Sequence, residues 1–352
     1  MTTIYVTHPR YPEHDFPQHP EHAGRIRAVW RRLDAAGLTS RMNAVTATPA
    51  TDDMLLAVHA QGYLRLLERL SAQQRTVLLD ADTYATPTSY EIARLAAGGV
   101  VRAVDAVLRG DANNGLAVVR PPGHHAVPQS GMGFCLLSNI AIAARYAQQQ
   151  HGVERILIVD YDVHHGNGTE AAFYDDSTVL FVSTHQFPLY PGTGTLHDVG
   201  SGPATGFTVN VPIPGGHSDG SYAAIFEHII WPLAERFAPQ LVLVSAGYDG
   251  HWADPLAGMR LSLAGYDHLA RELLNIAERL CDGKIDFVIE GGYNLDVLSY
   301  GVGNLAHVLL GDPEVDDPLG PPDDGRAEPD IASLIAQVRT IHNLPSVSGD
   351  AP

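Results

Sequence analysis

Short apolar runs alternate with helical patterns along most of this chain. Near-continuous apolar residues, typical of parallel strands covered on both faces, predict seven buried strands, at residues 4–6, 116–119, 156–159, 179–182, 207–211, 241–245 and 287–289. Small and apolar residues at helical spacing predict helices between them, at residues 19–36, 89–109, 139–150, 221–237, 265–280 and 295–310. This alternation predicts right-handed βαβ crossovers and therefore an α/β fold in which helices cover both faces of a parallel sheet.

The C-terminal part of the chain has a different character. Residues 311–330 are acidic and rich in proline, which predicts a surface excursion. Residues 331–344 predict a last helix that packs back on the fold, and residues 345–352 predict a disordered tail. Because no low-complexity linker interrupts the chain before residue 310, we expect a single domain over residues 1–344.

Polar motifs follow five of the predicted strands. They are RPPGHHA (120–126), DYDVHHGNG (160–168), STHQ (183–186), SAGYDG (245–250) and EGGYN (290–294). Ligands of open parallel sheets bind beyond the carboxyl ends of the strands. We therefore expect the five motifs to meet in one crevice.

The DYDVHHGNG motif has the spacing of a metal site. Asp162 and His164 are two residues apart, so on an extended segment their side chains point to the same side. A carboxylate and an imidazole suit zinc or a similar first-row ion. Asp249, which taken alone is an ordinary turn acid, can supply a third ligand from another strand end and leave a coordination position open for substrate. His165 faces the other way and is expected to be packed.

Two adjacent histidines are candidates for acid–base catalysis. His124 and His125 follow a Pro–Pro–Gly turn, and one of them is a natural general base for a metal-activated water. Asp160 and Asn167 flank the metal ligands and can orient the imidazoles through their second nitrogens. Tyr293 can donate a hydrogen bond to a carbonyl oxygen as negative charge develops on it. Taken singly, the histidines also fit hydrogen-bonded loop residues and Tyr293 fits a turn aromatic, but together they predict metal-assisted hydrolysis of an amide.

The composition narrows the range of partners. The 352 residues include 40 acids against 22 Lys plus Arg, a formal charge of −18, which disfavours nucleic acid and tolerates cationic substrates such as Lys-rich tails or polyamines. No segment reaches the roughly 18 apolar residues of a membrane helix, and the N-terminus lacks the pattern of a secretion signal. Because Cys135 and Cys281 are the only cysteines, no disulfide framework is expected, and the cytoplasm is the expected compartment.

These motifs, in this order, resemble those of the zinc-dependent histone deacetylase family, which includes acetoin-utilisation proteins and acetylpolyamine amidohydrolases. The resemblance covers roughly residues 3–310. It implies an arginase-like α/β domain with a central eight-stranded parallel sheet, and one zinc ion per chain on Asp162, His164 and Asp249. It also implies that His125 is the general base, that His124 lies beside it with Asp160 behind, and that Tyr293 stabilises the oxyanion.

The same resemblance implies potassium ions and a substrate tunnel. The residues implied at a potassium site near the zinc are Asp160, Asp162, His164, Ser183 and Thr184, and those at a second monovalent site are Phe173, Asp176, Val179 and Phe207. The residues implied in substrate binding are Phe134 and Tyr190 as aromatic walls of an acyl-lysine tunnel, Gly133 and Gly292 with them, and Leu256 at the pocket rim. Asp82 stands where some members hold the substrate backbone, and a turn-forming acid is the alternative. Arg25 matches an arginine near an internal acetate-release path, for which a buried structural arginine is the alternative.

Two positions refine this comparison. Asn167 stands where class I enzymes have an acid and resembles the class II pattern, so it can still orient His125 but with less charge. Leu256 stands where polyamine-preferring relatives can carry an acid, which favours acyl-lysine in a peptide. Since Tyr293 is the tyrosine that weakly active relatives have lost, an active enzyme is expected.

Three alternatives share parts of the pattern. An arginase-type ureohydrolase needs two manganese ions and more bridging carboxylates, whereas this chain offers Asn167 and His251. An acetylpolyamine amidohydrolase shares all the catalytic parts. A non-catalytic acyl-lysine reader is disfavoured by the complete set of candidate catalytic residues. The sequence therefore favours a zinc-dependent hydrolase that removes acetyl or other short acyl groups from lysine.

Overall fold

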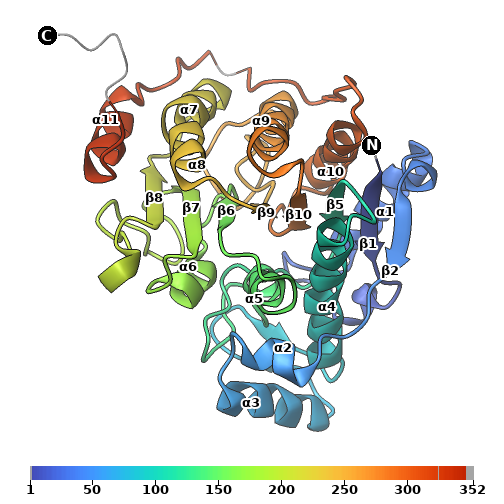
Figure 1. Cartoon of the computed structure of the whole chain (residues 1–352). Coiled ribbons are helices and arrows are strands. Elements are labelled where there is room, and N and C mark those ends of the chain that lie inside the picture. Colours follow the sequence, from blue (N-terminus) through green and yellow to red (C-terminus); the bar gives the residue numbers. More distant parts are fainter. Residues whose placement is uncertain (1, 324, 346–352) are drawn as a thin grey trace, which may run out of the picture.

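The computed structural model describes residues 2–323 and 325–345, and eight parallel strands form its central sheet (Figure 1). Their order is β2-β1-β5-β10-β9-β6-β7-β8. In this order the strands are Asn43–Thr46, Thr3–Thr7, Asn114–Ala117, Ile285–Ile289, Leu241–Ala246, Ile156–Asp160, Val179–Gln186 and Thr208–Ile213. A separate antiparallel pair joins Val77–Leu78 (β3) to Tyr84–Ala85 (β4). The parallel eight-stranded sheet that was predicted is confirmed.

Helices cover both faces of this sheet. Their bounds are Gly24–Ala35 (α1), Asp52–Leu56 (α2), Gln61–Ala72 (α3), Ser89–Leu108 (α4), Asn139–His151 (α5), Asn167–Phe173 (α6), Asp219–Ile225 (α7), Trp231–Phe237 (α8), Leu263–Cys281 (α9), Leu295–Leu310 (α10) and Ala332–Ile341 (α11). In Figure 1, α7 to α10 lie along one side of the sheet and α4 and α5 along the other. The inner strands are buried throughout because helices pack on both sides of them.

The strand register brings the carboxyl ends of the central strands to one edge. Asp160, the last residue of β6, pairs with Ser183 on β7 and with Ser245 on β9. On the next strand, Ile289 of β10 pairs with Ala246 of β9. The motifs that follow β6, β9 and β10 therefore start at the same level of the sheet.

The helices predicted at residues 19–36 and 221–237 differ most from the structure. Helix α1 begins at Gly24 instead of residue 19, because side chains bind the preceding amides: His22 Nδ1 accepts from Gly24 N at 3.0 Å and Asp15 Oδ1 from Ala23 N at 2.8 Å. The helix expected at 221–237 is divided by a π-helical turn at Phe226–Ile230. Pro232 follows in the first turn of α8 and has no N–H to continue the ladder.

The C-terminal segment follows the prediction in outline. Residues 312–323 and 325–330 contain no helix or strand and run across the outside of the helices (Figure 1), and α11 then packs beside β8. Of the tail expected at 345–352, residues 346–352 lie outside the described residues. None of the described helices combines the length and apolarity that a bilayer crossing requires.

Candidate active site

Three predicted metal ligands meet beyond the ends of β6 and β9. His164 Nδ1 lies 3.1 Å from Asp162 Oδ1 and 3.1 Å from Asp249 Oδ2. One donor atom from each residue lies within 4.8 Å of the other two, and both carboxylates are fully buried. Asp249 is far from Asp162 and His164 in the sequence. Because β6 pairs with β9, residue 249 lies beside the segment that follows residue 160.

The surrounding backbone orients the two carboxylates of this triad. The N–H of Gly291 donates to Asp162 Oδ2 at 2.8 Å, and the N–H of Val163 donates to Asp249 Oδ1 at 3.0 Å. A Cβ on Gly291 would meet Asp249 Oδ2 at 2.1 Å and Asp162 Oδ2 at 2.5 Å, so only glycine fits beside the pair. Asp249 thus uses Oδ1 on the backbone and presents Oδ2 toward His164, whereas Asp162 Oδ1, which faces the His164 ring, also accepts from the His164 N–H at 2.9 Å.

The triad has the chemistry of a divalent-cation site. Two carboxylates and one imidazole form the N/O donor set that zinc accepts. Burial disfavours a charged imidazole, but the hydrogen bonds to Asp162 and Asp249 outweigh it and raise the pKa of His164 to about 10. Two buried carboxylates beside one imidazole therefore favour a bound positive charge, and a divalent cation supplies it.

The two predicted catalytic histidines lie beside the triad with their second nitrogens engaged. His124 Nδ1 lies 2.9 Å from Asp160 Oδ2, and His125 Nδ1 lies 2.7 Å from Asn167 Oδ1. The His125 ring centroid is 4.0 Å from that of His124 and 5.8 Å from that of His164. The two orienting residues predicted from the sequence are therefore in contact with the histidines that they were expected to orient.

The environments of the two histidines separate their pKa values. Burial lowers the pKa of His125 well below its usual value, and the neighbouring His124 and His164 lower it further. Burial also opposes charge on His124, but Asp162 and Asp160 prevail and raise its pKa. Two adjacent imidazoles whose pKa values are shifted in opposite directions suit a base and its electrostatic partner.

Tyr293 is held by its backbone and by its ring. Asp254 Oδ2 accepts from the N–H groups of Tyr293 at 2.7 Å and Asn294 at 3.1 Å. The ring packs edge-on against Phe134 at 5.6 Å between centroids, and the Arg25 guanidinium lies 5.0 Å from its centroid. Burial raises the pKa of Tyr293 well above its usual value, so the phenol keeps its proton.

Arg25 is a buried arginine with structural partners. Its Nε donates to the carbonyl oxygen of Gly292 at 2.7 Å, and its Nη1 lies 3.1 Å from Glu21 Oε1. It also donates to the carbonyl oxygen of Glu290. These contacts fix the backbone on both sides of Gly291, next to the metal triad.

An aromatic ring and a tight glycine turn pack around His125. The Tyr190 ring packs edge-on against His125 at 5.1 Å between centroids. Phe134 has a left-handed backbone with φ of 68°, held by a hydrogen bond from its N–H to Thr83 Oγ1. A Cβ on Gly133 would lie 2.3 Å from the His125 ring and 2.9 Å from that of Tyr190. The structure therefore brings Phe134, Gly133 and Tyr190 together around the catalytic histidine.

The other two predicted substrate contacts, Asp82 and Leu256, lie on separate loops. Asp82 is half-buried, and its carbonyl oxygen accepts from His19 Nε2 at 2.7 Å. His19 in turn packs edge-on against Phe134 at 4.6 Å. The N–H of Leu256 donates to Asp254 Oδ1 at 3.0 Å, so its loop is tied to the carboxylate that holds Tyr293.

The residues expected to hold potassium form two groups. Near the triad, Asp160 ends β6, and Thr184 Oγ1 on β7 lies 3.3 Å from the Asp160 carbonyl oxygen, while Ser183 Oγ contacts His185. In the second group, the turn that follows α6 links Phe173 to Asp176 and Val179 through backbone hydrogen bonds, and the Phe207 carbonyl accepts from Phe181 N.

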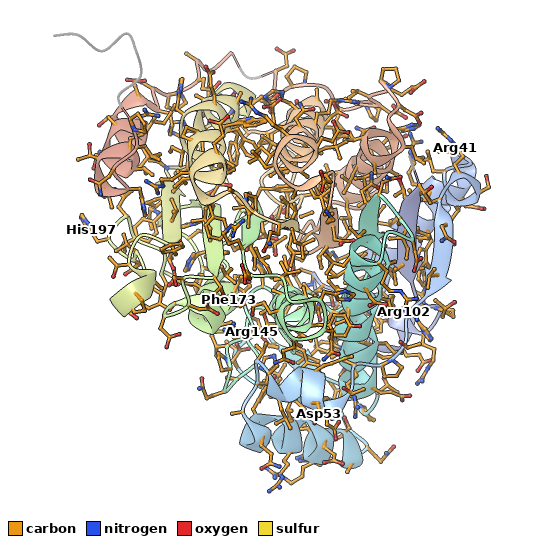
Figure 2. The ribbon with its side chains drawn as sticks, in the orientation of Figure 1. Arg41, Asp53, Arg102, Arg145, Phe173 and His197 are labelled. Atoms are coloured by element: carbon orange, nitrogen blue, oxygen red, sulfur yellow. The ribbon has the colours of Figure 1, made fainter. Side chains whose placement is uncertain are left out.

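Asp176, the acid of the second group, is already paired with a basic side chain. Asp176 forms an ion pair with Arg145, and the Arg145 guanidinium lies 4.5 Å from the Phe173 ring centroid (Figure 2). Oxygen ligands for potassium at this position would therefore come chiefly from backbone carbonyls.

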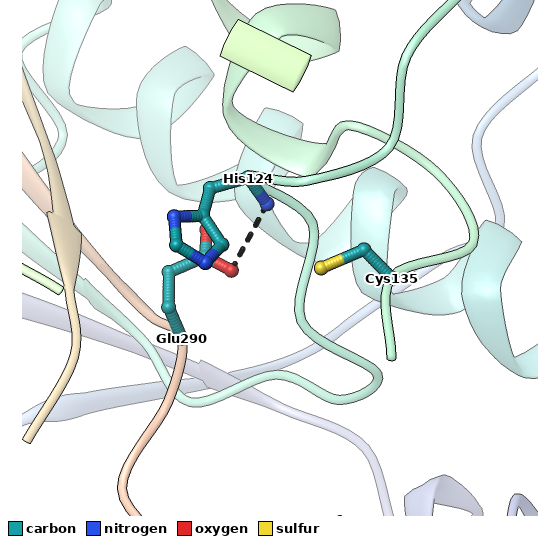
Figure 3. A group of neighbouring side chains, drawn as sticks. All are labelled: His124, Cys135 and Glu290. Atoms are coloured by element: carbon teal, nitrogen blue, oxygen red, sulfur yellow. Dashed lines mark hydrogen bonds between the residues drawn. The ribbon is translucent and has the colours of Figure 1, made fainter. Parts of the chain in front are cut away.

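His124 and His125 lie on the loop of residues 120–126, called the histidine loop below. A second group of possible metal donors consists of His124, Cys135 and Glu290 (Figure 3). Its donor atoms lie within 4.8 Å of one another, but they are committed elsewhere. His124 Nδ1 faces Asp160, and Glu290 Oε2 accepts from the N–H groups of Gly123 and His124. Burial raises the pKa of the Cys135 thiol well above its usual value, whereas a metal binds the thiolate. This group does not fit a metal ion.

Sequence reasoning gave no role to Asp254 and Glu290. Asp254 stands in the loop that carries Leu256, and its sequence context carries no signal beyond that of a turn acid. Glu290 was noted as part of the EGGYN motif, and its burial at the end of an apolar strand was the available signal. His165 is buried as predicted, with Thr193 at 2.8 Å and Glu170 at 3.1 Å.

Comparisons with known proteins agree with this geometry. A family model described as "Histone deacetylase domain" matches residues 19–309. The chain is 42% identical over 335 residues to histone deacetylase 10, chloroplastic, of Oryza sativa subsp. japonica, covering 90% of this chain and 75% of the relative. It is 42% identical over 314 residues to a probable deacetylase of Archaeoglobus fulgidus, covering 88% and 85%. A histone deacetylase-like amidohydrolase of Pseudomonas aeruginosa is 43% identical over 279 residues, covering 78% and 72%.

A solved structure shows the same fold. The crystal structure of the HDA15 HD domain superposes with a TM-score of 0.88 at 36% sequence identity, covering 97% of this chain and 94% of that one. The shared fold therefore extends over the sheet, the covering helices and the loops that carry the triad.

Proposed function

Because the chain belongs to the histone deacetylase family, we propose that it is a zinc-dependent amidohydrolase that removes acetyl or other short acyl groups from the ε-amine of lysine in proteins or peptides. The observation that carries this proposal is the buried Asp162–His164–Asp249 triad with two oriented imidazoles beside it. A family match alone supports deacetylase chemistry, and the donor set supports zinc in particular.

In this proposal the triad residues hold one zinc ion. When bound, zinc polarises the substrate carbonyl and makes water a stronger nucleophile at neutral pH. Asp249 would contribute Oδ2, Asp162 would contribute the Oδ1 that faces the His164 ring, and His164 would contribute Nδ1. Three protein ligands leave room for substrate at the ion.

His125 is the proposed general base. Its Nδ1 faces the amide oxygen of Asn167, so the proton lies on Nδ1 and Nε2 is free to accept another. Its lowered pKa keeps it neutral until it takes the proton of the attacking water, and it then holds the proton that the leaving amine needs. His124, backed by Asp160, supplies positive charge next to the developing intermediate.

Tyr293 and the aromatic walls complete the proposed site. The Tyr293 hydroxyl donates a hydrogen bond to the carbonyl oxygen as negative charge develops there. Phe134 and Tyr190 enclose a thin aliphatic chain and exclude water, with Gly133 and Gly292 giving the backbone room. Asp82 is the proposed contact to the substrate backbone, and Leu256 is the proposed rim residue.

Three broader expectations belong to the same proposal. A single catalytic domain over residues 1–344 is supported by one continuous core cluster that includes both Ile4 and Leu344. Potassium at the two positions stays a prediction from the family resemblance. The cytoplasm stays the predicted compartment, although the rice relative carries a chloroplast name.

A turnover panel on purified, zinc-loaded protein tests the function. Acetyl-lysine peptide, longer acyl-lysine peptides and acetylspermidine are compared, with chelator-treated protein and His125→Ala as controls. We expect the highest kcat/KM on an acyl-lysine peptide and loss of turnover in both controls. A preference for acetylspermidine would assign the polyamine alternative, and bound zinc without turnover of any substrate would refute hydrolysis.

A further inference from the structure

Glu290 is a buried carboxyl group immediately behind the two catalytic histidines, and the mechanism proposed above does not use it. It follows the last residue of β10, and its side chain is almost completely buried. Figure 3 shows the Glu290 carboxylate reaching the backbone nitrogen of His124, with the Cys135 side chain nearby.

The carboxylate binds the backbone of the histidine loop. Oε2 accepts a hydrogen bond from the N–H of Gly123 at 2.6 Å and a second from the N–H of His124 at 3.2 Å. Oε1 lies 3.4 Å from the hydroxyl of Ser245 on β9, which donates to it. Consecutive amide groups on one oxygen fix both the position and the direction of the loop where the imidazoles begin.

The same residue is fixed at its own backbone. Its N–H donates to the carbonyl oxygen of Ala246 at 3.0 Å, and its carbonyl oxygen accepts from Arg25. One residue later, Gly291 N–H binds Asp162 Oδ2 of the metal triad. Glu290 therefore joins the histidine loop to the strand ends that carry the proposed metal ligands.

The backbone of the histidine loop is tightly enclosed at Gly123. A Cβ on Gly123 would meet the N–H nitrogen of Asn139 at 2.6 Å and the carbonyl oxygen of Leu137 at 2.7 Å. The loop is thus pressed between α5 and the carboxylate. If the carboxylate withdraws, two buried amides lose their acceptor, and the backbone must shift or admit water to satisfy them.

We propose that Glu290 is a positioning residue for catalysis, which sets the place of His124 and His125 by accepting the N–H groups of Gly123 and His124. This inference rests on the proposed hydrolase function, because only there do the two imidazoles act on a reacting group. What Glu290 contributes is the reach of its acceptor oxygen to the two amides, and neither its charge nor a transferable proton is required.

Two substitutions of Glu290 distinguish the effect of its side-chain length from the effect of its charge. Glu290→Gln keeps an oxygen at the same distance from the backbone and removes the charge, and its NH₂ can face the Ser245 hydroxyl. Glu290→Asp keeps the charge and withdraws the oxygens by one C–C bond, about 1.5 Å. The same pair of changes at Glu235, an exposed acid on α8 that pairs with Arg279, is the matched control.

The first measurement is steady-state turnover of an acetyl-lysine peptide by zinc-loaded protein. Because a displacement of about 1 Å in a catalytic group can cost on the order of 100-fold in rate, we expect Glu290→Asp to lower kcat about 100-fold with KM and bound zinc nearly unchanged. Glu290→Gln should stay within about threefold of the unsubstituted chain. The reverse order of the two variants, equal loss in both, or no loss in either would overturn the proposal.

The second measurement does not depend on activity. Hydrogen exchange at the amides of Gly123 and His124 should stay slow in Glu290→Gln and become fast in Glu290→Asp, with amides of the distant helix α9 unaffected in both. Unchanged protection in Glu290→Asp would refute the positioning role. If the unsubstituted zinc-loaded protein hydrolyses none of the substrates, the proposed function fails, whereas the exchange experiment still decides whether Glu290 holds the loop.

Discussion

Asp286 lies in the middle of β10 with a carboxyl group that has no hydrogen-bond partner among the described residues. Its register partners are Gly115 on β5 and Leu243 on β9. A Cβ on Gly115 would come within 1.6 Å of Asp286 Oδ1, so the carboxyl lies directly over that glycine. Burial raises the pKa of Asp286 well above its usual range, and no charged neighbour offsets it.

We predict that Asp286→Val stabilises the protein and that the gain grows with pH. Above pH ~4 the unfolded chain ionises this carboxyl while the folded chain keeps it protonated, so the unfolded state binds fewer protons. The free energy of unfolding of the unsubstituted protein then falls by about 1.4 kcal/mol per pH unit until the pH reaches the folded pKa. Removing an unpaired buried polar group adds a pH-independent gain of about 1–3 kcal/mol.

Urea unfolding followed by circular dichroism at pH 5, 6 and 7 measures this effect. The stability difference between Asp286→Val and the unsubstituted protein should widen as the pH rises from 5 to 7, by up to about 1.4 kcal/mol per pH unit wherever the folded carboxyl stays protonated. Other titrating groups contribute equally to both proteins and cancel in the difference. Asp286→Asn, which keeps the shape without titrating, should remove the same pH dependence without the full apolar gain.

Two results would refute this reasoning. A stability difference that does not change with pH would mean that Asp286 is ionised in the folded protein and has a partner there. Lower stability of Asp286→Val at pH 7 would mean that the carboxyl contributes a favourable interaction that outweighs its burial.

The remaining predictions concern the proposed active site. Asp249→Ala should lose stoichiometric zinc, measured by elemental analysis after dialysis, because two protein ligands remain; full retention would contradict its role as a ligand. His125→Ala should keep zinc and lose about 10²–10⁴-fold in kcat, the usual contribution of a general base, and near-normal turnover would remove His125 from that role. Tyr293→Phe should lower kcat more than it raises KM in steady-state kinetics, since the phenol acts on developing charge, and a change confined to KM would assign it to binding only.

Much of the fold follows from local pattern. Helix α10 has the predicted bounds, and α4 ends one residue before its predicted end, because both carry long apolar faces. Strand β2 was missed because it is an edge strand whose four residues are exposed or half-buried, so it has no apolar run. Helix α3 was also missed, although its buried Tyr63, Leu64 and Leu67 have helical spacing that carried the signal.

The site was predictable where its parts lie in contiguous motifs. Asp162 and His164 share one strand end, and the rule that ligands bind at carboxyl strand ends was sufficient to bring Asp249 to them. The contacts of Asp254 with Tyr293 N and of Glu290 with the histidine loop could not be predicted, because they join residues about 40 and 167 positions apart through backbone amides. No local pattern encodes such a pairing.

The place of β10 in the sheet has a consequence for biosynthesis. This strand separates β2, β1 and β5 from β9, β6, β7 and β8, and it is the last of the eight in the chain. A nascent chain that has not yet emerged beyond residue 289 therefore holds two half-sheets, each with an unpaired inner edge of buried, apolar strands. Such edges invite aggregation, so ribosome-bound fragments of this protein should depend on chaperones until that strand arrives.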